Sequence, residues 1–245
     1  MLRAASLAAV FACAALLAGC GEDEPPPAPE LPADRLLDRA FERLPGSGRA
    51  AIDLEAQLPQ DPSERVAAGF EGPFVAGGGV PRFDLEGEAE AAGFGAELRL
   101  VSTGDDAFVV FFGENYRVGR DRVAALGQRA SGLEPRGWFG PAEHAGVGEV
   151  EGADCHRIEA PLERGRLAAD LDRIGLGAGV GGLEGGTVEA CLGVDDGMIR
   201  ALELSSEGLI LDLSLSDLGE EQEIEPPPGG GFQPVDELLE RIPGP

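Results

Sequence analysis

Apolar and polar side chains alternate along several segments of this chain, and this pattern limits the possible folds more than any other feature. In residues 50–58, for example, Ile52 and Leu54 alternate with Asp53 and Glu55. The same alternation recurs in residues 65–74, 82–91, 94–102, 198–206 and 209–217. Repeated period-two alternation, interrupted by Gly- and Asp-rich turns, predicts a mostly antiparallel sheet with one solvent-exposed face and one apolar face.

The apolar face of such a sheet must be covered. Three further segments have the spacing of amphipathic helices: residues 33–44, 120–130 and 163–175. Gly72 and Gly87 fall at inward positions, where a strongly bent sheet would lack side chains. We therefore expect a mainly β fold of the α+β class, in which short helices pack against the concave apolar face of one strongly curved antiparallel sheet.

Residues 105–118 depart from the alternation because both sides of this segment are apolar. One side carries Phe108, Val110 and Phe112, and the other carries Ala107, Val109 and Phe111. Two interpretations are open. The strand is central and buried on both sides, or one of its sides lines a space for a ligand. Periodicity alone does not choose between them.

The N-terminus has the features of an export signal. Residues 1–19 combine an early cation, Arg3, with a short apolar run and small residues. The sequence Leu17-Ala18-Gly19-Cys20 resembles the lipobox of bacterial lipoproteins, which implies cleavage before Cys20 and acylation of its thiol. Residues 20–34 then form a Pro-rich, acidic tether. The alternatives are a plain secretory peptide with a chance cysteine and a disordered leader without a spacing role.

Two cysteines remain after export. Cys13 leaves with the signal peptide and Cys20 carries the lipid, so Cys155 and Cys191 are expected to form a disulfide. Each cysteine faces away from the apolar side of its strand, which is compatible with pairing across neighbouring strands. The alternative, a redox-active pair, lacks the C-x-x-C spacing.

The charge of the chain excludes one class of partner. Arg and Lys together number 19 against 45 acidic residues, for a net charge of −26. Such a chain repels phosphate backbones, so we expect no nucleic-acid partner. Anionic headgroups repel it as well, so membrane attachment must rest on the acyl anchor.

The sequence contains no recognisable catalytic motif. His144 and His156 are the only histidines, and neither belongs to a nucleophile, metalloprotease or phosphate-binding pattern. We interpret His156, on a strand beside Asp154, as solvated or hydrogen-bonded in a turn. Acidic turn residues are explained by local backbone hydrogen bonds. We therefore expect neither an enzyme nor a metal site nor a cofactor.

The order of these features resembles one family. An acylated cysteine, a tether, the helix in LLDRAFERL, then FFGENYRVG and the segment RGWFGPAEHAGVGEVEGADCHRIEAPLE are similar to the LolA-like half-barrel lipoproteins, especially the actinobacterial LppX and LprG lipoproteins. The resemblance covers residues 36–225. It implies an unclosed barrel around an apolar cavity that accepts acyl chains. The half-barrel domain would span residues 35–225, followed by a Pro- and Gly-rich tail, 226–245, with a short amphipathic helix.

These observations and the resemblance together give one functional expectation. The chain would be a monomeric lipoprotein, anchored by a palmitate-type acyl group on the extracytoplasmic face of the cell membrane. It would bind lipid or glycolipid acyl chains for carriage or presentation in the envelope, with an envelope transporter as a possible partner. The expected cavity residues are Phe70, Phe74, Phe83, Leu85, Phe94, Leu98, Phe108, Val110 and Phe112. The alternative is a structural or sensory lipoprotein with a filled core that binds a protein.

Overall fold

The computed structural model describes residues 31–58, 61–77, 80–91, 93–174, 185–229 and 231–241. The predicted signal peptide, the lipidation site Cys20 and most of the tether lie outside these ranges. The strands are β1 (Ser47–Leu58), β2 (Asp61–Val75), β3 (Arg82–Ala91), β4 (Phe94–Ser102), β5 (Ala107–Phe111), β6 (Glu114–Val118), β7 (Glu143–Val150), β8 (Ala153–Pro161), β9 (Thr187–Gly193), β10 (Ile199–Ser206), β11 (Leu209–Ser216) and β12 (Gln233–Pro234). The helices are α2 (Ala33–Glu42), α3 (Arg120–Ala130), α4 (Arg164–Ile174), α5 (Val235–Arg241) and the 3₁₀ turn η1 (Pro135–Trp138).

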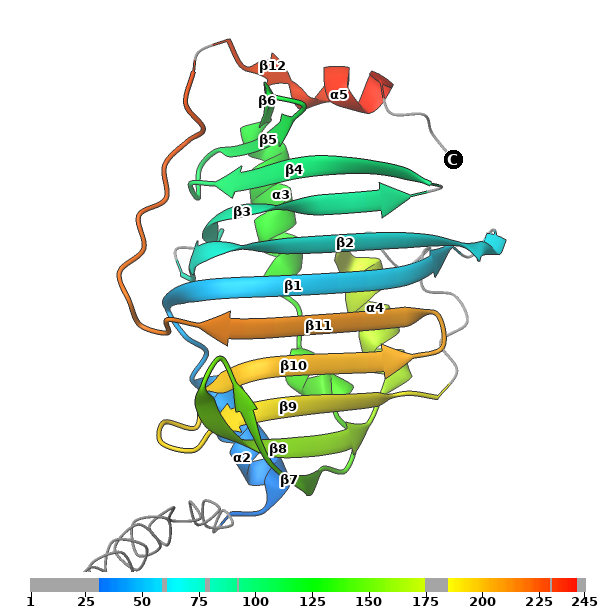
Figure 1. Cartoon of the computed structure of the whole chain (residues 1–245), viewed down its shortest axis with the longest axis vertical. Helices are drawn as coiled ribbons and strands as arrows, with labels where there is room; N and C mark the ends of the chain where they lie inside the picture. Colours follow the sequence, from blue (N-terminus) through cyan, green and yellow to red (C-terminus); the bar gives the residue numbers. More distant parts are fainter. Residues whose placement is uncertain are drawn as a thin grey trace, which may run out of the picture.

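All twelve strands form one sheet in the order β12-β6-β5-β4-β3-β2-β1-β11-β10-β9-β8-β7. Every neighbouring pair is antiparallel except β12 with β6. The sheet ends at β12 and β7, which do not pair with each other, so it is an unclosed barrel (Figure 1). The expected fold class is confirmed.

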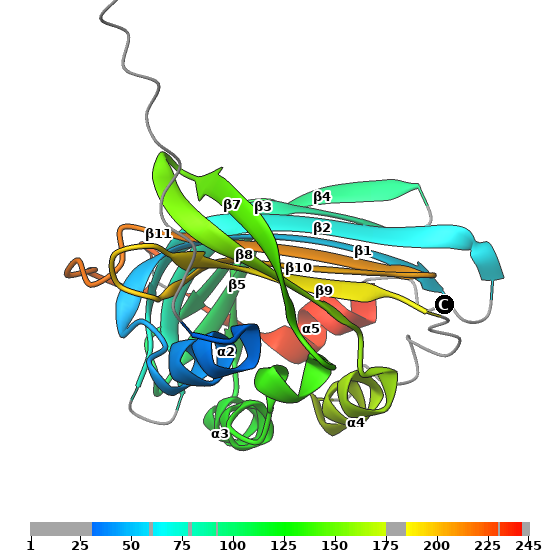
Figure 2. The same cartoon turned by 90° about the horizontal axis from the view of Figure 1, so that it is seen from below.

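The helices all lie on one side of the sheet, which we call the inner face (Figure 2). The best-packed part of the core lies between this face and α2, η1 and α4. Leu37 of α2, Ile158 of β8, Leu167 of α4 and Leu204 of β10 are almost completely buried there. The rings of Phe41 and Phe139 add an edge-to-face contact at 5.8 Å. This core extends along the inner face from β8 to the edge of β1.

Strands β2 and β3 approach each other closely at two glycines. A Cβ atom at Gly87 would overlap the carbonyl oxygen of Gly69, and one at Gly72 would overlap that of Asp84. No other residue type fits at these two positions without moving a backbone. Both positions therefore require glycine because the neighbouring backbone approaches them closely.

Cys155 and Cys191 form the expected disulfide between β8 and β9. Their Cα atoms lie 5.4 Å apart, and Arg157 pairs with Cys191 in the register. Ile158 faces the core while both cysteines lie on the opposite, outer face. The chain-entropy model assigns a bridge with this sequence separation of 36 a stabilisation of roughly 3–4 kcal/mol.

The segment after residue 225, expected as a tail, packs against the far edge of the sheet. β12 adds a short parallel strand beside β6, and the ring of Phe232 stacks on that of Phe108 at 4.8 Å. The following helix, α5, is tied down by Arg241, whose Nη1 lies 2.6 Å from Oε2 of Glu114 and 2.9 Å from the hydroxyl of Tyr116. Helix α5 lies at the β6 end of the inner face (Figures 1 and 2).

Candidate functional site

Strands β2–β5, which we call the open half, bring most of the predicted cavity residues onto the inner face. The register pairs Phe74 with Phe83, and Phe70 with Gly87, which in turn pairs with Leu98. Directly opposite residues of neighbouring strands point to the same side. The apolar inner-face side chains of the open half are Val66, Phe70, Phe74, Phe83, Leu85, Phe94, Leu98, Leu100, Val109 and Phe111.

The open half differs from strands β8–β10, the closed half, in how well its apolar side chains are covered. In the closed half, Ile158, Val188 and Ala190 are fully buried by the helices. In the open half, nine of the ten side chains named above are only half-buried. The tenth, Phe94, is 57% exposed. The inner face is therefore tightly packed at one end and only partly covered along β2–β5, where α3 lies behind the sheet (Figure 1).

Small residues form a row across the inner face of the open half, which we call the alanine trough. Ala68, Ala89 and Ala96 lie directly opposite one another on β2, β3 and β4. The larger side chains of Phe70, Leu98 and Phe111 form the row on one side, and those of Val66 and Phe94 flank the other. This row of methyl groups therefore lies between rows of bulkier apolar side chains and runs across the strands.

One part of the predicted cavity set is wrong. The register pairs Leu98 with Phe111 and Leu100 with Val109, so these β5 residues face inward. Phe108 and Val110 face outward, and Phe112 lies in the β5–β6 turn, where it is 70% exposed. Residue Phe108 is buried because Phe232 covers it from outside. The strand is therefore apolar on both sides, which is why alternation did not fix its direction.

The β6 edge of the open half is closed by a buried tyrosine that sequence reasoning missed. Tyr116 is fully buried, and its hydroxyl donates to Glu114 and accepts from Arg241 of α5. These hydrogen bonds lower the pKa of Glu114, first through Tyr116 and then through Arg241. Helix α3 lies behind the sheet, with Val123 buried and Leu126 52% exposed (Figures 1 and 2).

His156 is not in the environment expected for it. It shares the inner face with Ile158, is only 9% exposed, and its Nδ1 has no hydrogen-bond partner among the described residues. Burial lowers the pKa of this imidazole, and the nearby His144 lowers it further. The expectation of a solvated or turn-bonded imidazole is wrong, because the residue has the same strand parity as the core.

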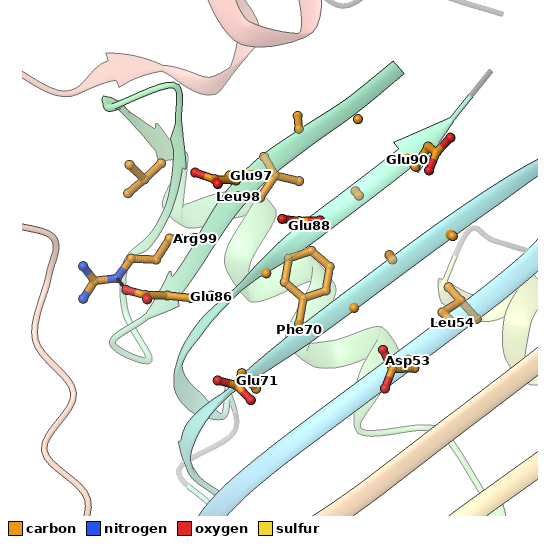
Figure 3. A pocket seen from close by; sticks show the side chains of 18 of the residues that line it. Asp53, Leu54, Phe70, Glu71, Glu86, Glu88, Glu90, Glu97, Leu98 and Arg99 are labelled. Atoms are coloured by element: carbon orange, nitrogen blue, oxygen red, sulfur yellow. Dashed lines mark ion pairs between the residues drawn. The ribbon is translucent and has the colours of Figure 1, made fainter. Parts of the chain in front are cut away.

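A second feature, which we call the outer hollow, lies over β1–β4 and has a volume of about 1410 Å³ (Figure 3). Most of its lining residues have the outward parity of their strands, although Leu54, Phe70 and Leu98 of the inner face also line it. Its lining includes seven carboxylates: Asp53, Glu55, Glu71, Glu86, Glu88, Glu90 and Glu97. Arg99 is the only cation that lines it. This guanidinium donates two hydrogen bonds to Asp84, at 2.7 Å each, and these bonds raise its pKa.

Two further findings concern metal binding and membrane-spanning helices. Among the described residues, no group of three or more His, Cys, Asp or Glu side chains is arranged to hold a metal ion. None of the helices in the described ranges is both long and apolar enough to span a bilayer.

The fold is shared with mycobacterial proteins of known structure. LprF from Mycobacterium bovis is 15% identical, with a TM-score of 0.56 over 83% of this chain and 100% of that chain. The lipoprotein LppX from Mycobacterium tuberculosis is 13% identical, with a TM-score of 0.53 over 79% of this chain and 96% of that chain. The sequence matches no family model and no curated protein. The chain therefore shares the fold of LprF and LppX.

Proposed function

We propose that this protein is an extracytoplasmic lipoprotein, anchored through Cys20, that binds the acyl chains of a lipid or glycolipid against its open half. The apolar inner face of β2–β5, whose side chains are only half-buried, carries this proposal. Soluble proteins rarely expose a large contiguous apolar surface unless it serves binding. Each CH₂ group removed from water contributes about 0.8 kcal/mol, so one long chain lying in the alanine trough gives useful affinity.

The trough favours acyl chains over headgroups. Ser102 is the only polar side chain among the inner-face positions of β2–β5 from residue 66 onward, and its hydroxyl already donates to the carbonyl of Pro81 at 2.8 Å. The sheet thus offers a headgroup no free polar partner there. We infer that the protein accepts lipids with different headgroups and carries or presents them in the envelope.

Support for the envelope location comes from the lipobox-like sequence before Cys20 and from the fold shared with the lipoprotein LppX.

Native mass spectrometry tests the binding function. The mature domain, expressed without residues 1–20, is delipidated and mixed with envelope lipids of matched acyl chains and different headgroups. We expect adducts of one lipid per chain for several headgroups. Absence of any adduct would favour the alternative, a filled lipoprotein that binds a protein partner.

A further inference from the structure

The outer hollow lies on a sheet face without any covering element in the described part of the chain. All labelled helices lie on the inner side, and the segment that follows β11 runs past the strand ends instead of across β1–β4 (Figures 1 and 2). Outward-facing positions of an antiparallel sheet are usually a mixture of charges. Here the lining has seven carboxylates and one arginine, Arg99. This arginine already forms ion pairs with Asp84 and Glu86.

Five of the carboxylates stand in two rows, which we call the rails. The small residues between the rails form the floor of the hollow. Asp53 and Glu55 stand on β1, and Glu86, Glu88 and Glu90 stand on β3. Between them, β2 contributes the small residues Ala67 and Gly69. The carboxylate of Asp53 lies directly beside this floor, because a Cβ atom added at Gly69 would lie 2.7 Å from Oδ1 of Asp53. Figure 3 shows the rails on either side of β2.

This arrangement places like charges opposite each other on neighbouring strands. Glu71 lies directly opposite Glu86, and Glu88 lies directly opposite Glu97. Like charges directly opposite each other on neighbouring strands are destabilising. A face that keeps two such pairs beside a low floor is suited to a ligand of opposite charge, which would relieve the repulsion.

The spacing indicates what kind of cation fits. Carboxylates on one rail recur at every second residue, or about 6.6–6.8 Å along a strand. An extended polypeptide presents alternate side chains to one face with the same repeat. A second copy of this chain, with its net charge of −26, would be repelled. We propose that the hollow docks an extended segment of another protein in which arginine or lysine occupies alternate positions.

The test uses a labelled peptide in which arginine and alanine alternate, and a second peptide of the same composition with its arginines in one block. Binding to the mature domain is measured by fluorescence anisotropy at about 0.15 M salt. We expect the alternating peptide to bind more tightly than the block peptide, because only its repeat matches both rails.

Two variants with equal charge change locate the site. Asp53→Asn/Glu88→Gln/Glu90→Gln neutralises both rails, and Glu207→Gln/Glu220→Gln/Glu221→Gln neutralises exposed carboxylates outside the hollow. We expect the first variant to weaken binding of the alternating peptide about tenfold and the second to change it little. The rail variant should keep or raise the thermal midpoint, because repulsion is removed, and should bind lipid as the wild type does.

The proposal is overturned if both variants weaken binding equally, since net charge alone would then explain it. It is also overturned if neither peptide binds, or if both bind with the same affinity. Calcium binding that the rail variant loses, without peptide binding, would replace the docking surface with a cation site.

Discussion

Single glycines permit the close approach of strands in the open half. Gly87 lies between Phe70 and Leu98 in the register, at the point where β2 and β3 come closest. A side chain at this position would overlap the backbone of Gly69 and Phe70. The close approach of β2 and β3 therefore depends on this residue.

Gly87→Ala should destabilise the protein, because the added methyl group overlaps the backbone of β2. We expect a loss of more than about 1 kcal/mol in the free energy of unfolding. Gly95→Ala is the control, since nothing lies within 4 Å of a Cβ at that position. Urea unfolding of both variants measures the difference. Equal effects would mean that close approach of the strands is not what requires Gly87.

Asp106 joins the sheet to α3. Its carboxylate accepts hydrogen bonds from Arg120 and Arg117, which lower its pKa to about 2. The unfolded pKa is about 3.9, so this contribution to stability is present above about pH 4 and is lost as the pH falls toward 2.

Asp106→Asn should therefore reduce the unfolding free energy by about 0.5–1 kcal/mol at pH 7, since the ion pairs are partly exposed. The difference from wild type should shrink between about pH 4 and pH 2. The neighbouring exposed carboxylate provides the control, as Asp105→Asn should have little effect at either pH. Chemical unfolding curves across this range report the trend. A pH-independent difference would exclude the ionised pair as its source.

Among the elements, regular alternation predicted the strands well. The segments 82–91 and 94–102 coincide with β3 and β4, because one of their faces is wet and the other apolar. For β5, alternation did not show which side faces inward. The reason is that Phe232, more than a hundred residues later in the chain, covers the outer side of this strand. The inward direction of Val109 and Phe111 depends on that long-range contact. The buried Tyr116 was missed for the same reason, since Arg241 and α5 complete its surroundings.

The same substitution in the two halves of the sheet should have opposite consequences. Ala96 lies in the trough of the open half, whereas Ala190 is fully buried in the closed half. Ala96→Trp should fold with little loss of stability and should reduce the amount of bound lipid. Ala190→Trp should overpack the core and cost about 1–3 kcal/mol or more.

Thermal midpoints and lipid stoichiometry from native mass spectrometry distinguish these outcomes. A large loss of stability in Ala96→Trp, with no lipid bound by that variant or by wild type, would indicate a filled interior along the whole sheet.

For the whole molecule, attachment to a membrane depends on Cys20. The lipobox-like sequence is the observation behind this prediction. Cys20→Ser should abolish labelling by a radioactive fatty acid in cells that process bacterial lipoproteins, and should leave the protein unprocessed or released. Cys13→Ser, inside the predicted signal peptide, is the matched control and should still be labelled. Labelling of Cys20→Ser would contradict the predicted site.

The position of β1 beside β11 has a consequence for how the chain folds. Strands β1–β6 and β7–β11 are each built largely from pairings between consecutive strands, whereas the β1–β11 pairing joins Arg49 to Ser216 across most of the sequence. Closing so long a loop is entropically costly, and pairings of high sequence separation form slowly. The two meanders are therefore expected to form first and to join along this central seam last, so its closure sets the folding rate.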